Sequence, residues 1–326
     1  MGSDPVRLAV TLGDPRGIGP EIVAALRADA AVAAVAELIV VGPEGTVADV
    51  DEPVGTWQSL GDAADRAAVA GRLAGRAIER AVGLAQSGTV DGIVTAPIDK
   101  AALLAGGYDY PGHTEMLATL TGTRVAMMLA SSAGADGLTH PLRVILATTH
   151  LPLREVPDAV TGEAIERAAD VTRRGLVEWF GVIDPRIALC ALNPHAGDGG
   201  RFGTEDDSVL RPAARRAGIA GPYPADTVFV RALRGEFDAV IAPYNDVGMT
   251  AIKVAAFGRA VNVTLGLPFP RTSPDHGTAI DIAGRGIADA SSMKESVRVC
   301  AMIARRLSTG GPTRPTRSAG RSSPAR

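Results

Sequence analysis

The stretch 6–36, "VRLAVTLGDPRGIGPEIVAALRADAAVAAVA", decides the fold class. It starts as an apolar run, turns through a loop rich in Gly and Pro, and continues as an Ala-rich segment with helical spacing. Pro20 stands where prolines commonly begin helices, and Asp14 lies in the preceding turn. Residues 6–12 are therefore predicted as a strand and residues 20–36 as helical.

The same pattern of strand, polar loop and helix recurs along the chain. Further apolar runs predicted as strands are residues 37–42, 91–97, 124–130, 142–150, 186–194, 237–243 and 260–266. They do not alternate with polar residues, which indicates strands covered on both faces of a parallel or mixed sheet. Helical spacing recurs at 63–86 and 161–180. This alternation predicts an α/β fold.

Composition limits the classes of function. A chain of 326 residues with 46% apolar residues suits two lobes of ordinary size. The net charge of −3 indicates no nucleic-acid or membrane partner, and no apolar run is long enough for a membrane span. Cys190 and Cys300 are the only two cysteines, which are too few for a disulfide framework in a chain of this length. Cys190 is expected in the core. No signal segment is recognised, so the cytoplasm is the expected location. A disordered basic tail is predicted at 309–326.

Most predicted strands end abruptly in a short polar motif. These motifs are "GDPRGIGPE" (13–21), "APIDK" (96–100), His150, "NPHAGDGG" (193–200), "YNDVG" (244–248) and "FPRTSPDHGTA" (269–279). Ligands of open α/β sheets bind beyond the carboxyl ends of strands. Ordinary turn chemistry explains any one motif, but a shared site explains six better. The first motif is neither a dinucleotide fingerprint nor a P-loop.

Two histidines close predicted strands. His150 and His195, with Asp246, contain the donors of a two-nitrogen, one-carboxylate metal site, and imidazoles there also suit acid–base chemistry. For either histidine alone, a hydrogen-bonded structural role is the alternative.

Further polar residues indicate an anion site. Thr114 in "GHTEM" is predicted to cap a helix whose first amides receive an anion. Capping accounts for Thr114 but does not require a histidine at position 113. Arg271 suits a carboxylate or phosphate, with solvated surface as the alternative. Lys100 and Lys253 stand out because the chain contains three lysines only.

Several long motifs together carry a family resemblance. They are "GDPRGIGPE", "TAPIDKAAL", "GHTEML", "THLPL", "LNPHAGDGGRFGTED", "GPYPADTVF" and "VNVTLGLPFPRTSPDHGTAIDIAGRG". In this order, over roughly residues 6–292, the sequence resembles the 4-hydroxythreonine-4-phosphate dehydrogenase family of pyridoxal phosphate biosynthesis. "HGTAIDIAGRGIAD" also resembles the cofactor loop of isocitrate and isopropylmalate dehydrogenases, which share that family's fold.

The resemblance implies a two-lobed isocitrate/isopropylmalate dehydrogenase-like α/β fold. Its sheet is mixed and largely parallel, with the active-site cleft between the lobes. Lobe one is expected at 1–130 plus 271–308, and lobe two, the dimerisation and metal side, at 131–270. A soft boundary falls at 131–141. The resemblance also implies a homodimer with a shared active site.

The implied reaction is oxidation of a secondary alcohol by NAD or NADP with a divalent metal (zinc, magnesium or manganese), followed by decarboxylation of the β-keto acid. The implied substrate is a small anion, 4-phosphohydroxythreonine. The implied catalytic residues are Lys253 and Asp246. Implied substrate-binding residues are His113, Thr114, Asp226, Lys253, Asn262 and Arg271. Implied cofactor-binding residues are His276, Gly277, Thr278, Ala279, Asp281 and Gly284. Implied metal ligands are His150, His195 and, at a position altered from the family, Asn245.

The "YNDVG" loop departs from the family pattern Tyr-His-Asp-Gln-Gly, whose histidine is a metal ligand reaching the site from the partner subunit. Asn245 occupies that position, and its amide oxygen suits magnesium or manganese better than zinc. Three readings stay open: the vitamin-pathway enzyme, a paralogue acting on an aromatic dicarboxylate cis-dihydrodiol or a phosphorylated four-carbon sugar acid, and a non-catalytic anion-binding protein.

Overall fold

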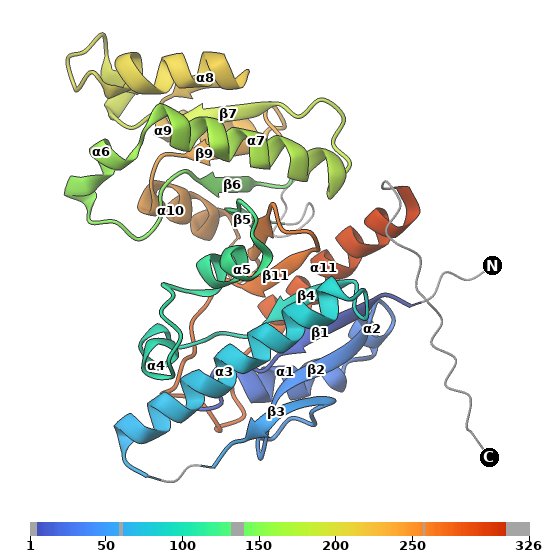
Figure 1. The fold of residues 1–326 in the computed structure, drawn as a ribbon. Coiled ribbons are helices and arrows are strands. Elements are labelled where there is room, and N and C mark those ends of the chain that lie inside the picture. Colours follow the sequence, from blue (N-terminus) through green and yellow to red (C-terminus); the bar gives the residue numbers. More distant parts are fainter. Residues whose placement is uncertain (1–4, 59–60, 132–139, 257, 311–326) are drawn as a thin grey trace.

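The computed structural model describes residues 5–58, 61–131, 140–256 and 258–310. Within them, eleven strands form one sheet (Figure 1). The strands are β1 (Arg7–Thr11), β2 (Glu37–Glu44), β3 (Glu52–Thr56), β4 (Gly92–Thr95), β5 (Ala126–Ala130), β6 (Arg143–Leu146), β7 (Ile187–Cys190), β8 (Ala220–Tyr223), β9 (Ala239–Ala242), β10 (Val261–Leu265) and β11 (Arg271–Pro274).

The sheet consists of two parallel blocks joined by antiparallel strands. Its order is β3-β2-β1-β4-β11-β10-β5-β6-β9-β7-β8. The block from β3 to β11 is parallel, and so is the block from β6 to β8. Between them, β10 and β5 pair antiparallel with each other and with their outer neighbours. The predicted α/β fold with a mixed, largely parallel sheet is confirmed.

Helices cover both faces of the sheet. They are α1 (Gly19–Arg27), α2 (Ala30–Ala33), α3 (Ala63–Gln86), α4 (Lys100–Ala105), α5 (His113–Thr121), α6 (Val156–Ala159), α7 (Gly162–Glu178), α8 (Arg211–Ala217), α9 (Ala225–Leu233), α10 (Asn245–Ala256) and α11 (Ser291–Gly310), with the short turns η2 (Leu153–Glu155), η3 (Pro194–Gly197) and η4 (Asp206–Leu210).

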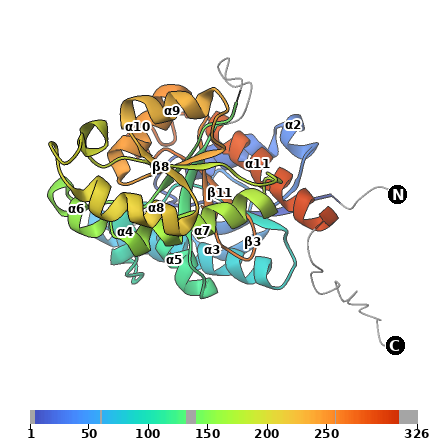
Figure 2. The same ribbon diagram turned by 90° about the horizontal axis from the view of Figure 1, so that it is seen from above.

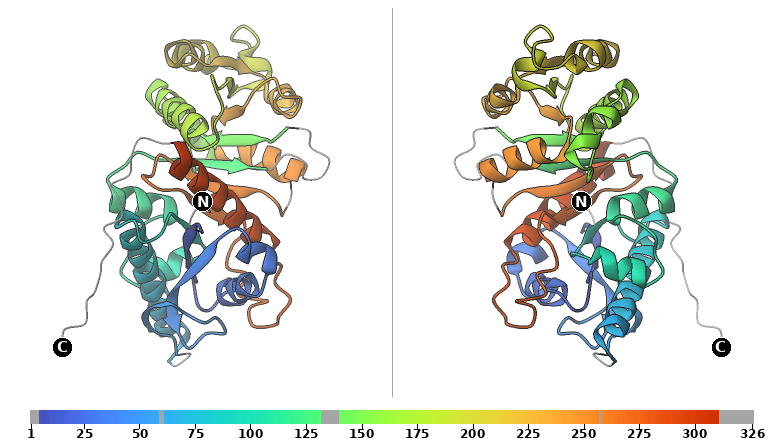
Figure 3. Two further views of the ribbon diagram at one scale, coloured as in Figure 1. Left: turned by 90° about the vertical axis from the view of Figure 1, so that its right-hand side faces the viewer. Right: turned by 90° about the vertical axis from the view of Figure 1, so that its left-hand side faces the viewer.

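The core follows this layering. One apolar cluster unites α3, α5, α7 and α8 on one face of the sheet. A second joins α1 and α11 on the other face of the first block, and a third joins α9 and α10 on the other face of the second block. Figure 2 shows α7 and α8 on one side of the sheet and α9 and α10 on the other. Figure 3 shows α11 crossing the middle of the molecule, where it packs against β4, β10 and β11.

Every apolar run predicted as a strand contains one, but β3, β8 and β11 were not predicted. β3 and β8 are short edge strands that contain Gly and Pro, and β11 reads "RTSP", a polar sequence that is nevertheless buried. The prediction of one helix at 20–36 is wrong in part. α1 ends at Arg27, and the Asp29 carboxylate caps α2 by accepting from the amides of Ala31 and Val32.

Some predictions concern other parts of the chain. Cys190 is fully buried, as expected. Residues 132–139 of the proposed boundary and residues 311–326 of the predicted tail lie outside the described residues. In the described part of the chain, no helix combines the length and apolar character needed to cross a membrane.

Candidate active site

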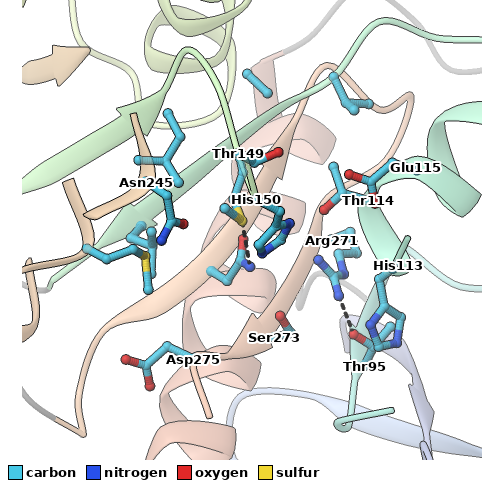
Figure 4. Close-up of a pocket in the computed structure, with 18 of the residues that line it drawn as sticks. Thr95, His113, Thr114, Glu115, Thr149, His150, Asn245, Arg271, Ser273 and Asp275 are labelled. Carbon is cyan, nitrogen blue, oxygen red and sulfur yellow. Dashed lines mark hydrogen bonds between the residues drawn. The ribbon is translucent and has the colours of Figure 1, made fainter. Parts of the chain in front are cut away.

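A cavity of about 460 Å³ lies where the two parallel blocks meet. Residues after β4, on α5 and at β11 line it from the first block, and residues after β6, on α7 and at the start of α10 line it from the second. Figure 4 shows this arrangement, with His113, Thr114 and Arg271 toward one side and Asn245 toward the other. Four of the six polar motifs predicted to share a site thus converge here, whereas residues 13–21 and 193–200 do not line the cavity.

Arg271 is the most deeply buried charge of the cavity. It is 1% exposed, and its Nη1 and Nη2 donate to the hydroxyls of Thr264 (2.9 Å) and Thr95 (2.6 Å), while Nε has no partner. No carboxylate of the described residues forms an ion pair with it. Burial lowers the pKa of Arg271 to about 10, against the opposing effects of Cys300 and Glu115. The guanidinium is therefore charged at neutral pH but uncompensated, which favours an anionic ligand.

Helix α5 points its first turn into this cavity. Gly112 occupies its N-cap and has no side chain to bind the free amides. The prediction that Thr114 caps this helix is wrong, because the helix already begins at His113. The first amides of α5 therefore remain available for an anion.

His113 lines the cavity beside Arg271. Its Nε2 is buried without a hydrogen-bond partner. Burial first, and then the charges of Arg271 and Lys100, hold the pKa of His113 well below its ordinary value. The ring is therefore neutral near pH 7. Asn262 also lines the cavity, with a buried Oδ1 that has no partner and an Nδ2 that lies 3.3 Å from the Met127 sulfur.

His150 and Asn245 lie on the cavity wall contributed by the second block. Burial and the charge of Lys100 lower the pKa of His150, while Glu115 opposes them. Asn245 is the first residue of α10, and its Nδ2 donates to Asp246 Oδ1 (2.9 Å). Asp246 lines a smaller neighbouring pocket of about 50 Å³ rather than the main cavity.

Besides Asp246, three further residues predicted to bind the substrate or the metal lie away from the cavity. His195 follows β7, is exposed, and has its ring centroid 6.3 Å from that of Phe202. Asp226 lies on α9, and Lys253 lies two turns along α10 from Asn245. No three His, Cys, Asp or Glu side chains of the described residues are placed to hold a metal together. Of the predicted metal ligands, His150 and Asn245 line the cavity, whereas His195 does not.

Backbone strain marks both histidines of the predicted metal site. His150 has φ +46°, and His195 (φ +55°) is followed by Ala196 (φ +56°), also in the left-handed region. Such conformations cost free energy and persist where the surroundings hold them. Here the fully buried Asp206 accepts from the amides of Leu192 (2.8 Å) and Asn193 (2.9 Å), which fixes the start of the His195 loop.

The predicted cofactor loop begins at the cavity and leads away from it. His276 and Gly277 line the cavity, and Nε2 of His276 is buried without a partner. The predicted residues Thr278, Ala279, Asp281 and Gly284 follow outside the cavity lining. The loop is held against the "GDPRG" turn by a hydrogen bond from the Ile18 amide to the Thr278 carbonyl (2.9 Å). Nothing lies within 4 Å of a Cβ built on Gly277, so the backbone is open to an extended ligand.

The cavity is also lined by residues to which the sequence assigns no role. Lys100 stands out in the sequence because lysine is rare, but its rarity alone indicates no function. Thr95 accepts a hydrogen bond from Arg271. It ends a predicted strand directly before "APIDK", and this position at a strand end is the feature of the sequence that could mark it as a site residue. Glu115 and Arg167 also line the cavity, and nothing in their helical segments distinguishes them from surface residues.

The chain matches known proteins over most of its length. Residues 23–300 match the family model described as "Pyridoxal phosphate biosynthetic protein PdxA". A protein of Beijerinckia indica, named 4-hydroxythreonine-4-phosphate dehydrogenase, is 43% identical over 321 residues, which cover 88% of this chain and 92% of that one.

Solved structures agree with this match. The 4-hydroxythreonine-4-phosphate dehydrogenase of Klebsiella pneumoniae is 38% identical with a TM-score of 0.78, covering 93% of this chain and 99% of that one. A terephthalate 1,2-cis-dihydrodiol dehydrogenase of Burkholderia xenovorans is 25% identical with a TM-score of 0.61, covering 91% and 98%. The family resemblance carried by the sequence motifs is confirmed.

Proposed function

Because this chain belongs to the pyridoxal phosphate biosynthetic protein PdxA family, we propose that it is a nicotinamide-dependent dehydrogenase that oxidises the secondary alcohol of 4-phosphohydroxythreonine. The observation that carries the substrate class is Arg271, a buried cation without a counter-ion at the wall of the cavity. A phosphate monoester carries nearly two negative charges at neutral pH and would supply that counter-ion.

The anion-binding chemistry follows from the groups around Arg271. The first turn of α5 offers unpaired amides, and the hydroxyl of Thr114 lies at the same end of the helix. Neutral His113 can donate to a phosphate oxygen or accept from a substrate hydroxyl through its buried, unpartnered Nε2. Asn262 offers an unpartnered carbonyl oxygen to a substrate donor. These contacts would hold the substrate in one orientation.

The cofactor site proposed on the loop from His276 to Gly284 fits a dinucleotide. It starts at the cavity, exposes backbone at Gly277, and carries an unpartnered ring nitrogen at His276. A bound nicotinamide supplies the acceptor for the hydride of the substrate carbinol. The hydroxyl proton must leave at the same time, and Lys253 is the proposed group that moves it, with Asp246 beside the site. The β-keto acid that results loses carbon dioxide.

A homodimer is proposed because three exposed apolar residues lie next to predicted site residues. Val254 (83% exposed) follows Lys253, Leu153 (68%) follows the His150 loop, and Phe202 (44%) lies beside His195. Burial of these side chains by a second copy would stabilise a pair. In a two-fold pair of α10 helices, the partner subunit's Lys253 would approach Asn245.

The donors of one chain do not form a metal site, so no chemical step is assigned to a metal. A divalent ion is proposed only between copies, where the partner's Asn245 would join His150 and His195. The proposed lobes, 1–130 with 271–308 and 131–270, have the cavity between them, since residues of both ranges line it. The cytoplasm is the proposed location.

The test is formation of NADH or NADPH. Purified protein is given 4-phosphohydroxythreonine or terephthalate cis-dihydrodiol, each with NAD or NADP and with zinc, magnesium, manganese or a chelator. Turnover of the phosphorylated substrate is expected. Turnover of the dihydrodiol alone would make this a paralogue whose altered Asn245 marks another substrate, and no turnover of either would favour a binding protein.

The shared site has its own test. Lys253→Ala and Arg271→Met are each expected to be inactive, and mixing them after reversible dissociation should restore activity to about a quarter of wild type, because half of the pairs are mixed and each has one intact site. No recovery from subunits shown to exchange would rule out the shared arrangement.

A further inference from the structure

Lys100 lies at the cavity mouth in a position that the fold determines closely. It is the first residue of α4 and lines the cavity. Its Cε is 3.7 Å from the place where a Cβ on Gly112 would stand, so its side chain extends toward the first turn of α5. An exposed lysine on a mobile loop would have no such fixed direction.

The start of α4 is held by a chain of polar contacts. The Asp99 carboxylate caps the helix by accepting from the Ala102 amide (2.8 Å), and its other oxygen lies 3.6 Å from Arg16 Nη2. Arg16 pairs in turn with the fully buried Asp14 (2.6 Å). The carboxylate adjacent to Lys100 is thus directed toward Arg16 and the helix amide.

Lys100 itself forms no ion pair with any described residue. The contrast with other cations is clear. Lys294 binds Asp29 (2.6 Å), and Arg167, the other exposed cation of the cavity, has Glu163 at 4.0 Å. The ammonium group of Lys100 is therefore available to a ligand.

The positive charge of Lys100 affects an ionisable group inside the cavity. It contributes to the lowered pKa of His113, after burial and after Arg271. The cavity is lined by three cations, Lys100, Arg167 and Arg271, and by the carboxylates of Glu115 and Asp275. Its cations outnumber its carboxylates, which favours an anionic ligand.

We propose that Lys100 binds the phosphate group of the substrate together with Arg271. Arg271 offers a fixed planar group from the cavity wall, and Lys100 offers a compact ammonium charge from the mouth. The two cations match the nearly two charges of a phosphate monoester, whereas a single carboxylate needs one. This assignment rests on the proposed function for the identity of the substrate, but the anion site can be tested without it.

The first experiment measures binding of inorganic phosphate to the full chain by calorimetry, with acetate in parallel. Lys100→Met should weaken phosphate binding about tenfold, the loss expected for one charge-assisted contact. Lys100→Arg should keep most of the affinity, because it keeps the charge. Lys294→Met is the matched control and should bind phosphate like wild type. Acetate binding should change little in Lys100→Met.

Kinetics separate binding from a merely structural role. Lys100→Met should raise the KM for 4-phosphohydroxythreonine by a similar factor with kcat nearly unchanged, since the contact is equally present in ground and transition states. Phosphate binding within twofold of wild type in Lys100→Met overturns the inference. An equal loss in Lys100→Arg overturns it too, because charge would then be irrelevant. If the wild type binds phosphate through Lys100 but forms no reduced cofactor, the inference stands and the proposed reaction fails.

Discussion

Gly71 of α3 packs directly against the backbone of α4, the helix that begins with Lys100, and leaves no room for a side chain. A Cβ on Gly71 would stand 1.7 Å from the Ala102 carbonyl oxygen and 2.7 Å from the Leu103 amide nitrogen of α4. Gly83, in the same helix, has nothing within 4 Å of the corresponding point. The pair Gly71→Ala and Gly83→Ala therefore makes one chemical change in one helix, with and without a clash.

The expected changes in the free energy of unfolding have opposite signs for the two variants. Alanine in place of an exposed helical glycine stabilises by about 0.5–1 kcal/mol, so Gly83→Ala should raise the free energy of unfolding. Gly71→Ala has the same intrinsic gain, but ordinary contact begins near 3.4 Å, so α4 would have to move by up to about 1.7 Å (3.4 − 1.7). Forced movement of packed backbone costs roughly 1–3 kcal/mol or more. A net loss of about 1–2 kcal/mol is therefore expected for Gly71→Ala.

Urea unfolding followed by circular dichroism measures both variants. Because α4 begins with Lys100, Gly71→Ala should also weaken phosphate binding, whereas Gly83→Ala should not. If Gly71→Ala is as stable as Gly83→Ala and binds phosphate normally, the close contact between α3 and α4 does not position the site, and this reasoning is refuted.

Three further perturbations probe the buried polar groups. Arg271→Met should lose phosphate binding. Its free energy of unfolding in urea should be no lower than that of wild type, because the pKa of Arg271, lowered to about 10, corresponds to roughly 3 kcal/mol of unfavourable burial. A loss of stability beyond about 2 kcal/mol would show that the arginine has a structural role. The pKa of His113 is lowered by folding, so the unfolded chain binds its proton first and stability falls below about pH 6.5, by up to about 1.4 kcal/mol per pH unit. His113→Gln should flatten this fall in unfolding experiments between pH 5 and 7, while the exposed His140→Gln should not; equal slopes would contradict the assignment. Asp206→Asn should cost about 1–3 kcal/mol in urea unfolding, because each carboxylate oxygen accepts from a different backbone N–H and asparagine replaces one of these oxygens by an NH2 donor. An unchanged midpoint would show that these bonds contribute little.

The sheet interior could be predicted from sequence because its strands are continuous apolar runs. The missed strands lack that signal for physical reasons. β3 and β8 lie at the two edges of the sheet, where Pro and Gly are tolerated, so their sequences read as loops. β11 is buried but polar, since Arg271 bonds two threonine hydroxyls and Thr272 donates to the Ser296 carbonyl (2.8 Å). Partners distant in sequence satisfy these groups, and one sequence does not reveal them.

The candidate site was predicted in part for a similar reason. His113 begins a helix, His150 follows a strand, and Asn262 and Arg271 lie near the starts of β10 and β11. The topology brings these residues to one cavity. Thr95 and Lys100 needed the structure, because their roles depend on what lies beside them. His195, Asp226 and Lys253 received their roles from family resemblance, and one chain alone does not bring them to the cavity. Their predicted roles await the test with mixed subunits.

The measurement that tests the central claim most directly is the rate of NADH formation from 4-phosphohydroxythreonine, with wild type and Arg271→Met compared at the same protein and substrate concentrations. The account predicts turnover by wild type and a loss of at least about a hundredfold in kcat/KM for the variant, since a buried charge pair with the substrate is removed. Wild-type turnover that survives in a folded Arg271→Met protein would contradict it, because the reaction would then not depend on the cavity described here.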